Sequence, residues 1–464
     1  MCLPLSLRSP SMKAQTASLP QRNFSRRQFL RKSGVAIGLA PALGAGCLSF
    51  LPRRLRAAEP EANNKIRVGL IGCGGRGRDV LGVFLSNKEV DCPIVCDVDD
   101  KMLIRAATDV EEKRGKAPER VKDFRRVLDR KDVDCVLVAT PDHWHALPTI
   151  YACQAGKDVY VEKPLARTIV EGRAMLEASR QYQRVVQMGT QWRSGQHQKD
   201  AVEFIKSGQL GKIGIVRGWA YLDWIAGIGK PSDCAPPTGV DYDMWLGPAP
   251  LRPFNPNRFH FNFRWFWDYA GGLMTDWGVH LINIMLWAMG PDHPRNISST
   301  GGRFVLDDNR ETPDTQVTTY EFPRYTLLWE HRVGSNNGPY NREWGITFNG
   351  SAGTLIISAD GWEVIPERKQ HELQAIKKTQ GGDERFPHVK NFLDCIKSRQ
   401  QPAENLELGH HVTTVAHLGN IALRVGRKIE WDGVNERIKG DRQADRLVTT
   451  EYRKPWKLPY TRKA

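Results

Sequence analysis

A short glycine-rich turn at residues 72–77 constrains the fold of this 464-residue chain more than any other stretch. The turn reads GCGGRG, fits the pattern G-x-G-x-x-G, and directly follows an apolar run at 66–71. Glycine adopts positive φ angles and allows another backbone or a phosphate to come close. A helix that begins there offers unpaired N–H groups and the positive end of its dipole. The turn therefore predicts a site for a dinucleotide pyrophosphate.

The residues around the turn favour a dinucleotide site over a structural turn that binds nothing. A helical stretch follows at 78–86, and a second apolar strand, at 93–96, ends in Asp97, twenty residues after Gly77. An acidic residue at that distance accepts hydrogen bonds from both ribose hydroxyls and repels a 2′-phosphate, so we predict NAD rather than NADP. The cofactor contacts predicted here are Gly72, Gly74, Gly75, Arg76, Gly77 and Asp97.

Apolar strands and helical stretches alternate between residues 65 and 190. The predicted strands are 66–71, 93–96, 135–139, 159–161 and 185–188, and the predicted helices lie near 78–86, 101–113, 147–155 and 169–181. Continuous hydrophobicity indicates strands buried on both faces of a mostly parallel sheet, with helices on each side. We predict an α/β domain with the doubly wound parallel sheet of the Rossmann fold. Its ligands should lie beyond the carboxyl ends of the strands, where residues 140–145 and 162–164 fall.

Beyond residue 190 the chain has longer loops, many aromatic residues and strands separated by turn signals. Strands are predicted at 213–219, 316–322, 326–331, 344–349 and 353–358, and a packed pair of helices at 386–398 and 408–425. This pattern predicts an α+β domain at 191–432 with an open, mainly antiparallel sheet. The basic segment 433–464 is expected to be an arm over a partner subunit or a loose tail.

The net charge of +15 belongs mostly to the first 58 residues. They hold ten Lys and Arg and no Asp or Glu, which leaves about +5 for the other residues. A nucleic-acid-binding role therefore loses its main support, and no nucleic-acid partner is expected.

The basic segment 1–58 has the features of an export signal. Arg26 and Arg27 precede Phe-Leu and a weakly apolar, Gly- and Ala-rich run at 33–47. This order resembles a twin-arginine signal, which predicts a periplasmic or exported protein that contacts the membrane only through this leader. An uncleaved interfacial helix is the alternative. The run is too short and too interrupted for a transmembrane span.

Cysteine and histidine patterns predict neither disulfides nor a metal site. The nine cysteines include no C-x-x-C pair, and we expect those beyond the leader to be small buried residues. His143 and His145 alternate, but no third ligand has suitable spacing.

Five motifs along the chain resemble, in content and order, those of the glucose–fructose oxidoreductase, inositol dehydrogenase and rhizopine-catabolism (Gfo/Idh/MocA) family. They are the glycine turn, Thr140-Pro141 with His145, VEKP at 161–164, GG at 271–272 followed by DWGVH at 276–280, and RKIEWD at 427–432. The resemblance implies a two-domain fold, NAD or NADP in the first domain, and a carbohydrate or polyol in a cleft facing the second sheet. It also implies a homo-oligomer.

Lys163 is the first candidate catalytic residue. Oxidation of a secondary alcohol requires a group that handles the hydroxyl proton while hydride leaves the carbon. A lysine partly removed from water beside a cationic ring can serve as acid, base or hydrogen-bond donor. The resemblance gives this role to the lysine of the Glu-Lys-Pro motif; the alternative is a surface lysine after a strand.

Asp276 and His280 are the other candidate catalytic residues. They lie four apart in a stretch, 273–289, with apolar residues at helical spacing, so one helix would place both on one face. The aspartate would then orient or charge-stabilise an imidazole that takes the proton. The resemblance implies substrate binding and proton transfer here; the alternative is a helix-end aspartate and a core histidine.

Further contacts are predicted from the loops around these residues. The resemblance places the cofactor near Thr140, Pro141, Trp144, His145, Glu162 and Lys163. Aromatic faces stack on the C–H faces of sugar rings. The predicted substrate contacts are Gln191, Arg193, Arg264, Trp267 and Tyr269. A salt bridge elsewhere would explain Arg193 equally well, and most of the aromatic rings are expected in the core.

The sequence favours an oxidoreductase that transfers hydride from a secondary alcohol of a sugar or polyol. An exported enzyme would need a tightly bound cofactor that is recycled on the same molecule. One alternative is an NAD-dependent glycosidase that oxidises C3 transiently and eliminates the leaving group; the presence of Lys163 favours the oxidoreductase. The other is a non-catalytic sugar-binding protein, since a fold does not define a function.

Overall fold

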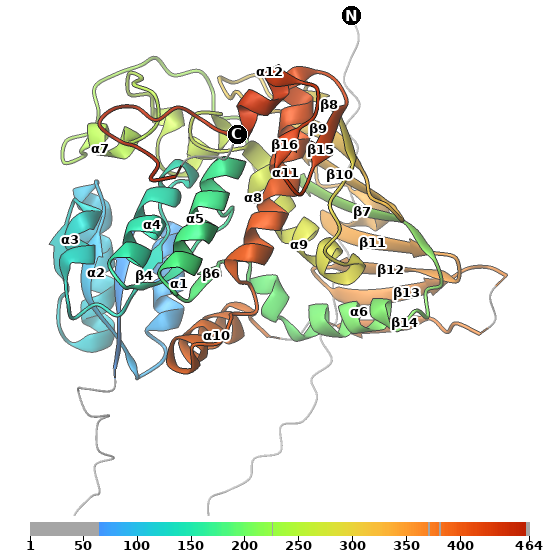
Figure 1. Cartoon of the computed structure of the whole chain (residues 1–464), viewed down its shortest axis with the longest axis horizontal. Coiled ribbons are helices and arrows are strands. Elements are labelled where there is room, and N and C mark those ends of the chain that lie inside the picture. Colours follow the sequence, from blue (N-terminus) through green and yellow to red (C-terminus); the bar gives the residue numbers. More distant parts are fainter. Residues whose placement is uncertain (1–64, 225, 370–371, 380–381, 461–464) are drawn as a thin grey trace, which may run out of the picture. The chain divides into compact units, whose positions relative to one another are not determined.

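The computed structural model describes residues 65–224, 226–369, 372–379 and 382–460, so the predicted leader lies outside the described residues. Figure 1 shows the fold, with many of the helices and strands labelled. Among the described residues, no helix has both the length and the apolar character needed to cross a membrane.

The first domain is built on a six-stranded parallel sheet in the order β3-β2-β1-β4-β5-β6. Its strands are β1 (Ile66–Ile71), β2 (Val90–Cys96), β3 (Glu119–Val121), β4 (Cys135–Val138), β5 (Asp158–Val161) and β6 (Val186–Met188). The helices are α1 (Gly75–Phe84), α2 (Asp100–Arg114), α3 (Phe124–Asp129), α4 (Ala146–Gln154) and α5 (Ile169–Gln181), with 3-10 turns η3 (Asp142–Trp144) and η4 (Gln191–Ser194).

This sheet confirms the predicted doubly wound fold. Every residue of β4 and β5 is buried, as the continuous apolar runs indicated, because helices cover both faces. Strand β3 was not predicted, since two of its three residues are exposed and it carries no apolar run.

The second domain contains a ten-stranded sheet in the order β14-β13-β12-β11-β7-β10-β9-β8-β15-β16. The strands are β7 (Ile213–Leu222), β8 (Asn296–Gly302), β9 (Thr315–Glu321), β10 (Thr326–Val333), β11 (Trp344–Gly350), β12 (Gly353–Ser358), β13 (Gly361–Pro366), β14 (Ile376–Thr379), β15 (Ile429–Asp432) and β16 (Arg437–Ile438). Among the strands of the described residues, only β7 and β10 pair in parallel, which confirms the mainly antiparallel prediction. Strands β8 and β13–β16 were not predicted; β8, for example, is rich in Ser, Thr and Gly.

Helices cover one face of this sheet. They include α6 (Gln196–Lys206), α8 (Gly272–Asp276), α9 (Gly278–Met289) and α11 (Leu406–Val425), followed along the chain by α12 (Arg442–Asp445) and η8 (Arg446–Val448). A Cβ atom at Gly218 of β7 would lie 2.0 Å from Met285 Cε, so the even-numbered residues of β7 face α9. The odd-numbered residues face away from the helices.

Two sequence-based predictions about packing are corrected by the structure. Helix α10 (Arg385–Ser398) packs against α1 and η4, whereas α11 packs against α5 and α9, so these two helices are not the expected pair. Tyr452 and Trp456 of the C-terminal arm pack on the first domain: Tyr452 Oη donates to Glu171 Oε1 at 2.7 Å, and the Trp456 ring lies 4.8 Å from that of Trp144. This part of the arm is therefore not a loose tail, and its contact with a partner subunit stays a prediction.

Candidate active site

A cavity of about 580 Å³ lies at the carboxyl ends of β1, β2, β4 and β5 and extends to the second domain. This is the edge of a doubly wound sheet where ligands bind, and the volume is within the range of small-molecule sites. The predicted residues that line it are Gly72, Gly74, Gly75, Arg76, Asp97, Thr140, Pro141, Trp144, His145, Glu162, Lys163, Arg264 and Asp276.

The glycine turn leaves space where a pyrophosphate would bind. Gly72 has a φ of +96° and no room for a side chain, because a Cβ atom would lie 2.6 Å from the Ala139 carbonyl. At Gly74 and Gly75, by contrast, a Cβ atom would meet nothing within 4 Å. Helix α1 starts at Gly75 without a side-chain cap, so its first N–H groups are available to an anion. The turn therefore fits the phosphates of NAD.

Asp97 lies at the end of β2, with its carboxylate fixed by the backbone. Asp97 Oδ2 accepts from Cys73 N at 2.7 Å, and Oδ1 accepts from Asp99 N at 3.0 Å. Each carboxylate oxygen can accept a second hydrogen bond, so both remain able to accept from ribose hydroxyls. Position and chemistry thus fit the predicted contact to the NAD ribose.

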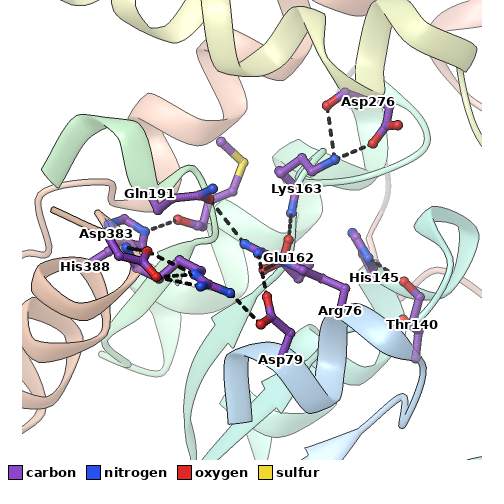
Figure 2. Close-up of polar contacts among 12 residues, drawn as sticks. Arg76, Asp79, Thr140, His145, Glu162, Lys163, Gln191, Asp276, Asp383 and His388 are labelled. Atoms are coloured by element: carbon purple, nitrogen blue, oxygen red, sulfur yellow. Dashed lines mark hydrogen bonds and ion pairs between the residues drawn. The ribbon is translucent and has the colours of Figure 1, made fainter. Parts of the chain in front are cut away.

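An ion-paired cluster joins the two domains at the other end of the cavity, and Figure 2 shows its Lys163–Asp276 pair. Lys163 Nζ donates to the Asp276 carbonyl at 3.0 Å and to Asp276 Oδ1, and Arg264 Nε donates to Asp276 Oδ2 at 3.0 Å. Burial alone would raise the pKa of Asp276, but the charges of Lys163 and Arg264 outweigh it and hold this pKa well below its usual value. Asp276 is therefore a carboxylate between two cations.

The predicted hydrogen-bonded pair of Asp276 and His280 is not formed. The expected single helix is broken at Trp277, between α8 and α9, and the Asp276 carboxylate is bound by cations instead. His280 packs its ring 5.0 Å from that of Trp192, and its Nδ1 atom is buried without a hydrogen-bond partner. Burial and the charge of Lys163 hold the pKa of His280 far below its usual value, so the imidazole is neutral.

Glu162 and Arg76 form the wall beside Lys163. Arg76 Nε donates to Glu162 Oε1 at 2.8 Å, and Arg76 Nη2 donates to Gln191 Oε1 at 3.2 Å (Figure 2). Gly189 makes room for this carboxylate, because a Cβ atom there would lie 2.7 Å from Glu162 Oε1. Gln191 thus reaches the site through Arg76.

The two loops after β4 and β5 are tied together by His145. Its Nδ1 lies 2.8 Å from the Pro164 carbonyl and its Nε2 lies 2.9 Å from the Thr140 carbonyl. Both contacts are to backbone oxygens, so this ring positions the loops that hold Lys163. Within the described ranges there is no group of three or more potential metal ligands.

Arg193, Trp267 and Tyr269, which were predicted as substrate contacts, do not line the cavity. Arg193 is ion-paired with buried Glu404 at 3.6 Å, which bears out the salt-bridge alternative. Tyr269 is fully buried, and Trp267 is covered by Arg424, 5.0 Å from its ring centre. Both aromatic rings are therefore packed within the protein rather than exposed to a ligand in the cavity. Gly77 does not line the cavity either. It packs against the Gly72 carbonyl, where a Cβ atom would not fit.

Several cavity residues were not predicted from the sequence. Asp142 lies in the loop after β4, and burial, together with the charge of Asp276, raises its pKa to about 8 against the opposing charge of Lys163. Because Asp142 comes shortly after a strand, its position in the sequence could have indicated a residue of the ligand site. The others come from segments far apart in the chain: Met102, Lys122, Phe124, Met244, Trp245, His260, Phe261 and Phe263.

Glu404→Gln is expected to change how stability depends on pH. Burial raises the pKa of Glu404 from its ordinary 4.5 to about 7. Between these values the folded protein retains a proton that the unfolded chain has lost, so this group lowers stability as pH rises through the window. The melting temperature of the variant minus that of the wild type should increase from pH 4.5 to 7. The control Glu407→Gln, at a side chain 72% exposed, should show no such trend.

The fold and the cavity define a class: a two-domain dinucleotide-binding protein with a polar site between a Rossmann sheet and an open antiparallel sheet. Residues 66–190 match the model described as oxidoreductase family, NAD-binding Rossmann fold. Residues 198–315 and 364–458 match that described as oxidoreductase family, C-terminal alpha/beta domain. The chain belongs to the Gfo/Idh/MocA family, as the sequence motifs indicated.

Curated relatives that match part of this chain include glycosidases. A glycosyl hydrolase family 109 protein of Saccharopolyspora erythraea is 32% identical over 43% of this chain and 46% of its own length. An alpha-N-acetylgalactosaminidase of Shewanella oneidensis is 30% identical over 41% of this chain and 44% of its own. The chain thus spans less than half the length of these curated relatives.

Solved structures share the fold across both domains. Levoglucosan dehydrogenase in complex with NADH and levoglucosan matches with a TM-score of 0.62 and 18% identity, over 79% of this chain and 99% of that one. The WlbA dehydrogenase of Bordetella pertussis in complex with NADH and UDP-GlcNAcA matches with a TM-score of 0.59 and 18% identity, over the same shares.

Proposed function

We propose that this protein is an NAD-dependent oxidoreductase that oxidises a secondary alcohol of a sugar or polyol. The observation that carries the proposal is the cluster of Lys163, Asp276 and Arg264 in one cavity with the uncapped glycine turn. A polyhydroxylated substrate suits a site with closely spaced charged donors and acceptors. Solved structures of the same fold hold NADH together with a sugar or a sugar nucleotide, which supports this substrate class.

The residues of the cluster suggest separate roles. NAD, when bound, supplies the ring that accepts hydride. Lys163, a cation in its ion pair, donates to the reacting hydroxyl and stabilises the negative charge that develops on its oxygen. Neutral His280, whose buried Nδ1 has no hydrogen-bond partner, does not line the cavity and would accept the proton through a water molecule. Asp276 accepts from a neighbouring hydroxyl, and the rings of Phe261 and Phe263 provide apolar faces for the sugar.

A redox-neutral NAD-dependent glycosidase is the second candidate. It is favoured by the curated relatives, which include an alpha-N-acetylgalactosaminidase. In that reaction, oxidation at C3 acidifies the C2 proton, the leaving group is eliminated, and water addition with re-reduction restores the sugar. The same neutral histidine and cationic lysine would be needed, so the two reactions differ in the bound substrate and in net redox change.

One experiment separates the two candidates. The folded protein is purified, bound NAD(H) is measured by absorbance, and free sugars, polyols and aryl glycosides are supplied in turn. Reduced cofactor that accumulates with a free sugar or polyol supports the oxidoreductase. Release of the aryl group without net reduction would reject it in favour of the glycosidase.

We also propose export by the twin-arginine route, on the basis of Arg26 and Arg27 before the weakly apolar run. Replacing both with lysine should keep the protein in the cytoplasm, because the signal is read by a receptor rather than by its charge. Cell fractionation and immunoblotting measure this. Unchanged periplasmic recovery of the double-lysine variant would contradict the proposal.

A homo-oligomer is proposed through the face of the ten-stranded sheet that points away from α9. Ile215 is 52% exposed and Val317 is 36% exposed, and strand register places both on that face. Light scattering after size-exclusion chromatography tests this, and a monomeric mass at micromolar concentration would contradict it.

A further inference from the structure

A segment of the second domain, residues 239–264, crosses onto the first domain beside the cavity; we call it the strap. Its first residues pair with the loop after β2. Asp100 N donates to the Gly239 carbonyl at 3.2 Å, Asp241 N donates to the Val98 carbonyl at 2.9 Å, and Asp99 forms a β-bridge with Val240. The strap is therefore attached next to Asp97, at the ribose end of the site.

The strap also forms one wall of the cavity. It contributes Met244, Trp245, His260, Phe261, Phe263 and Arg264 to the lining. Two of its contacts close this wall against the first domain: His260 Nε2 lies 2.9 Å from Asp99 Oδ2, and the Trp245 carbonyl accepts from Trp144 Nε1 at 2.9 Å. A dinucleotide in the cavity would lie between the glycine turn and this wall.

The C-terminal arm holds the strap from outside through Arg453. Arg453 Nη1 donates to Asp243 Oδ1 at 2.6 Å, Nη2 to the Asp243 carbonyl at 2.9 Å, and Nε to the Gly247 carbonyl at 3.0 Å. Its backbone N–H donates to the Pro248 carbonyl at 2.9 Å. An exposed ion pair alone contributes little, but a planar guanidinium that binds three acceptors fixes their geometry. These acceptors belong to α7 (Tyr242–Leu246) and the turn after it.

The arm also supports the first domain's wall of the cavity. Trp456 packs edge-on against Trp144, with ring centres 4.8 Å apart, and lies 6.5 Å from Phe124. Trp144 and Phe124 both line the cavity. The end of the described chain thus contacts the strap and the opposing wall at once.

We propose that the strap and the C-terminal arm form a clasp that slows release of the bound dinucleotide, with Arg453 as a positioning residue that acts through the strap. This inference rests on the proposed binding of NAD. For the dinucleotide to leave, the strap must move away from the first domain. This movement requires the hydrogen bonds between Arg453 and α7 to break. The clasp thereby suits an enzyme that recycles one cofactor molecule.

The release rate of NADH tests the clasp directly. The full-length protein is loaded with NADH, diluted into excess NAD, and the loss of bound NADH fluorescence is followed. Arg453→Met, which keeps the apolar stem but removes the hydrogen bonds, should release NADH about ten-fold faster, since changes of this kind act mainly on dissociation. The matched control is Arg427→Met: Arg427 also binds an aspartate, Asp441, but not the strap, and its release rate should equal that of wild type.

A second variant distinguishes the loss of the clasp from a change in the stability of the fold. Asp243→Asn alters a side chain that is 76% exposed and removes only the charge facing Arg453, so a smaller acceleration is expected with the same thermal unfolding of nucleotide-free protein. Equal release from wild type, Arg453→Met and Asp243→Asn would overturn the clasp and leave the proposed function standing. If wild type binds no NADH at all, the proposed function fails as well.

Discussion

Lys163→Met is expected to lower turnover roughly 10²–10³-fold, the cost of removing one donor that stabilises developing negative charge. Lys163 Nζ is bound to Asp276 at the end of the cavity opposite Asp97, so the glycine turn and the ribose site remain intact. The variant should therefore still bind NADH with nearly the wild-type dissociation constant. Steady-state kinetics and NADH fluorescence titration measure the two effects separately.

The control for this prediction is Lys390→Met. Lys390 is 72% exposed on α10 and pairs with Asp394, outside the cavity. Its turnover should equal that of wild type. A Lys163→Met protein that turns over at more than about one tenth of the wild-type rate would contradict the assigned role. Loss of a donor that stabilises developing negative charge should lower the rate roughly 10²–10³-fold.

Gly74→Ala and Gly77→Ala are expected to abolish NAD binding for different reasons. At Gly77 a Cβ atom would lie 2.0 Å from the Gly72 carbonyl oxygen, so α1 must shift away from β1. Overpacking of this kind costs about 1–3 kcal/mol, and Gly77→Ala should also lower the melting temperature. At Gly74 a Cβ atom meets nothing within 4 Å, so that variant should keep its stability. The added methyl group instead takes up the space that the pyrophosphate needs.

Calorimetric titration with NAD and thermal unfolding without it distinguish the two cases. Gly82→Ala is a suitable control, since the nearest atom to its Cβ is the flexible end of Lys113 at 3.5 Å. Full NAD affinity in Gly74→Ala would show that the phosphates do not bind at this turn.

The first domain could be predicted closely because its signals are local. Buried parallel strands are continuous apolar runs, and a glycine turn of fixed spacing is needed to pass from β1 into α1 beside a phosphate. Lys163 was identifiable for the same reason, since it directly follows β5 and parallel strands end at one edge of the sheet. The second domain was predicted less completely, because strands such as β8 and β14 are stabilised by their neighbours rather than by their own hydrophobicity.

The pairing of charges in the site depended on the tertiary structure. Spacing alone placed Asp276 beside His280, but Lys163 and Arg264 come from other segments and bind the carboxylate more strongly than a neutral imidazole would. In the same way, sequence composition could not tell the cavity residue Phe261 from the buried Tyr269 in one aromatic stretch.

By itself, then, the sequence determined the Rossmann sheet, the dinucleotide turn, the position of Lys163 and the family, because each depends on residues adjacent in the chain. Only the tertiary structure decided which groups neutralise Asp276, that the strap lines the cavity, and that Arg453 holds the strap from outside. These contacts join residues up to 210 positions apart, and no local pattern encodes which distant partner a charged side chain will meet.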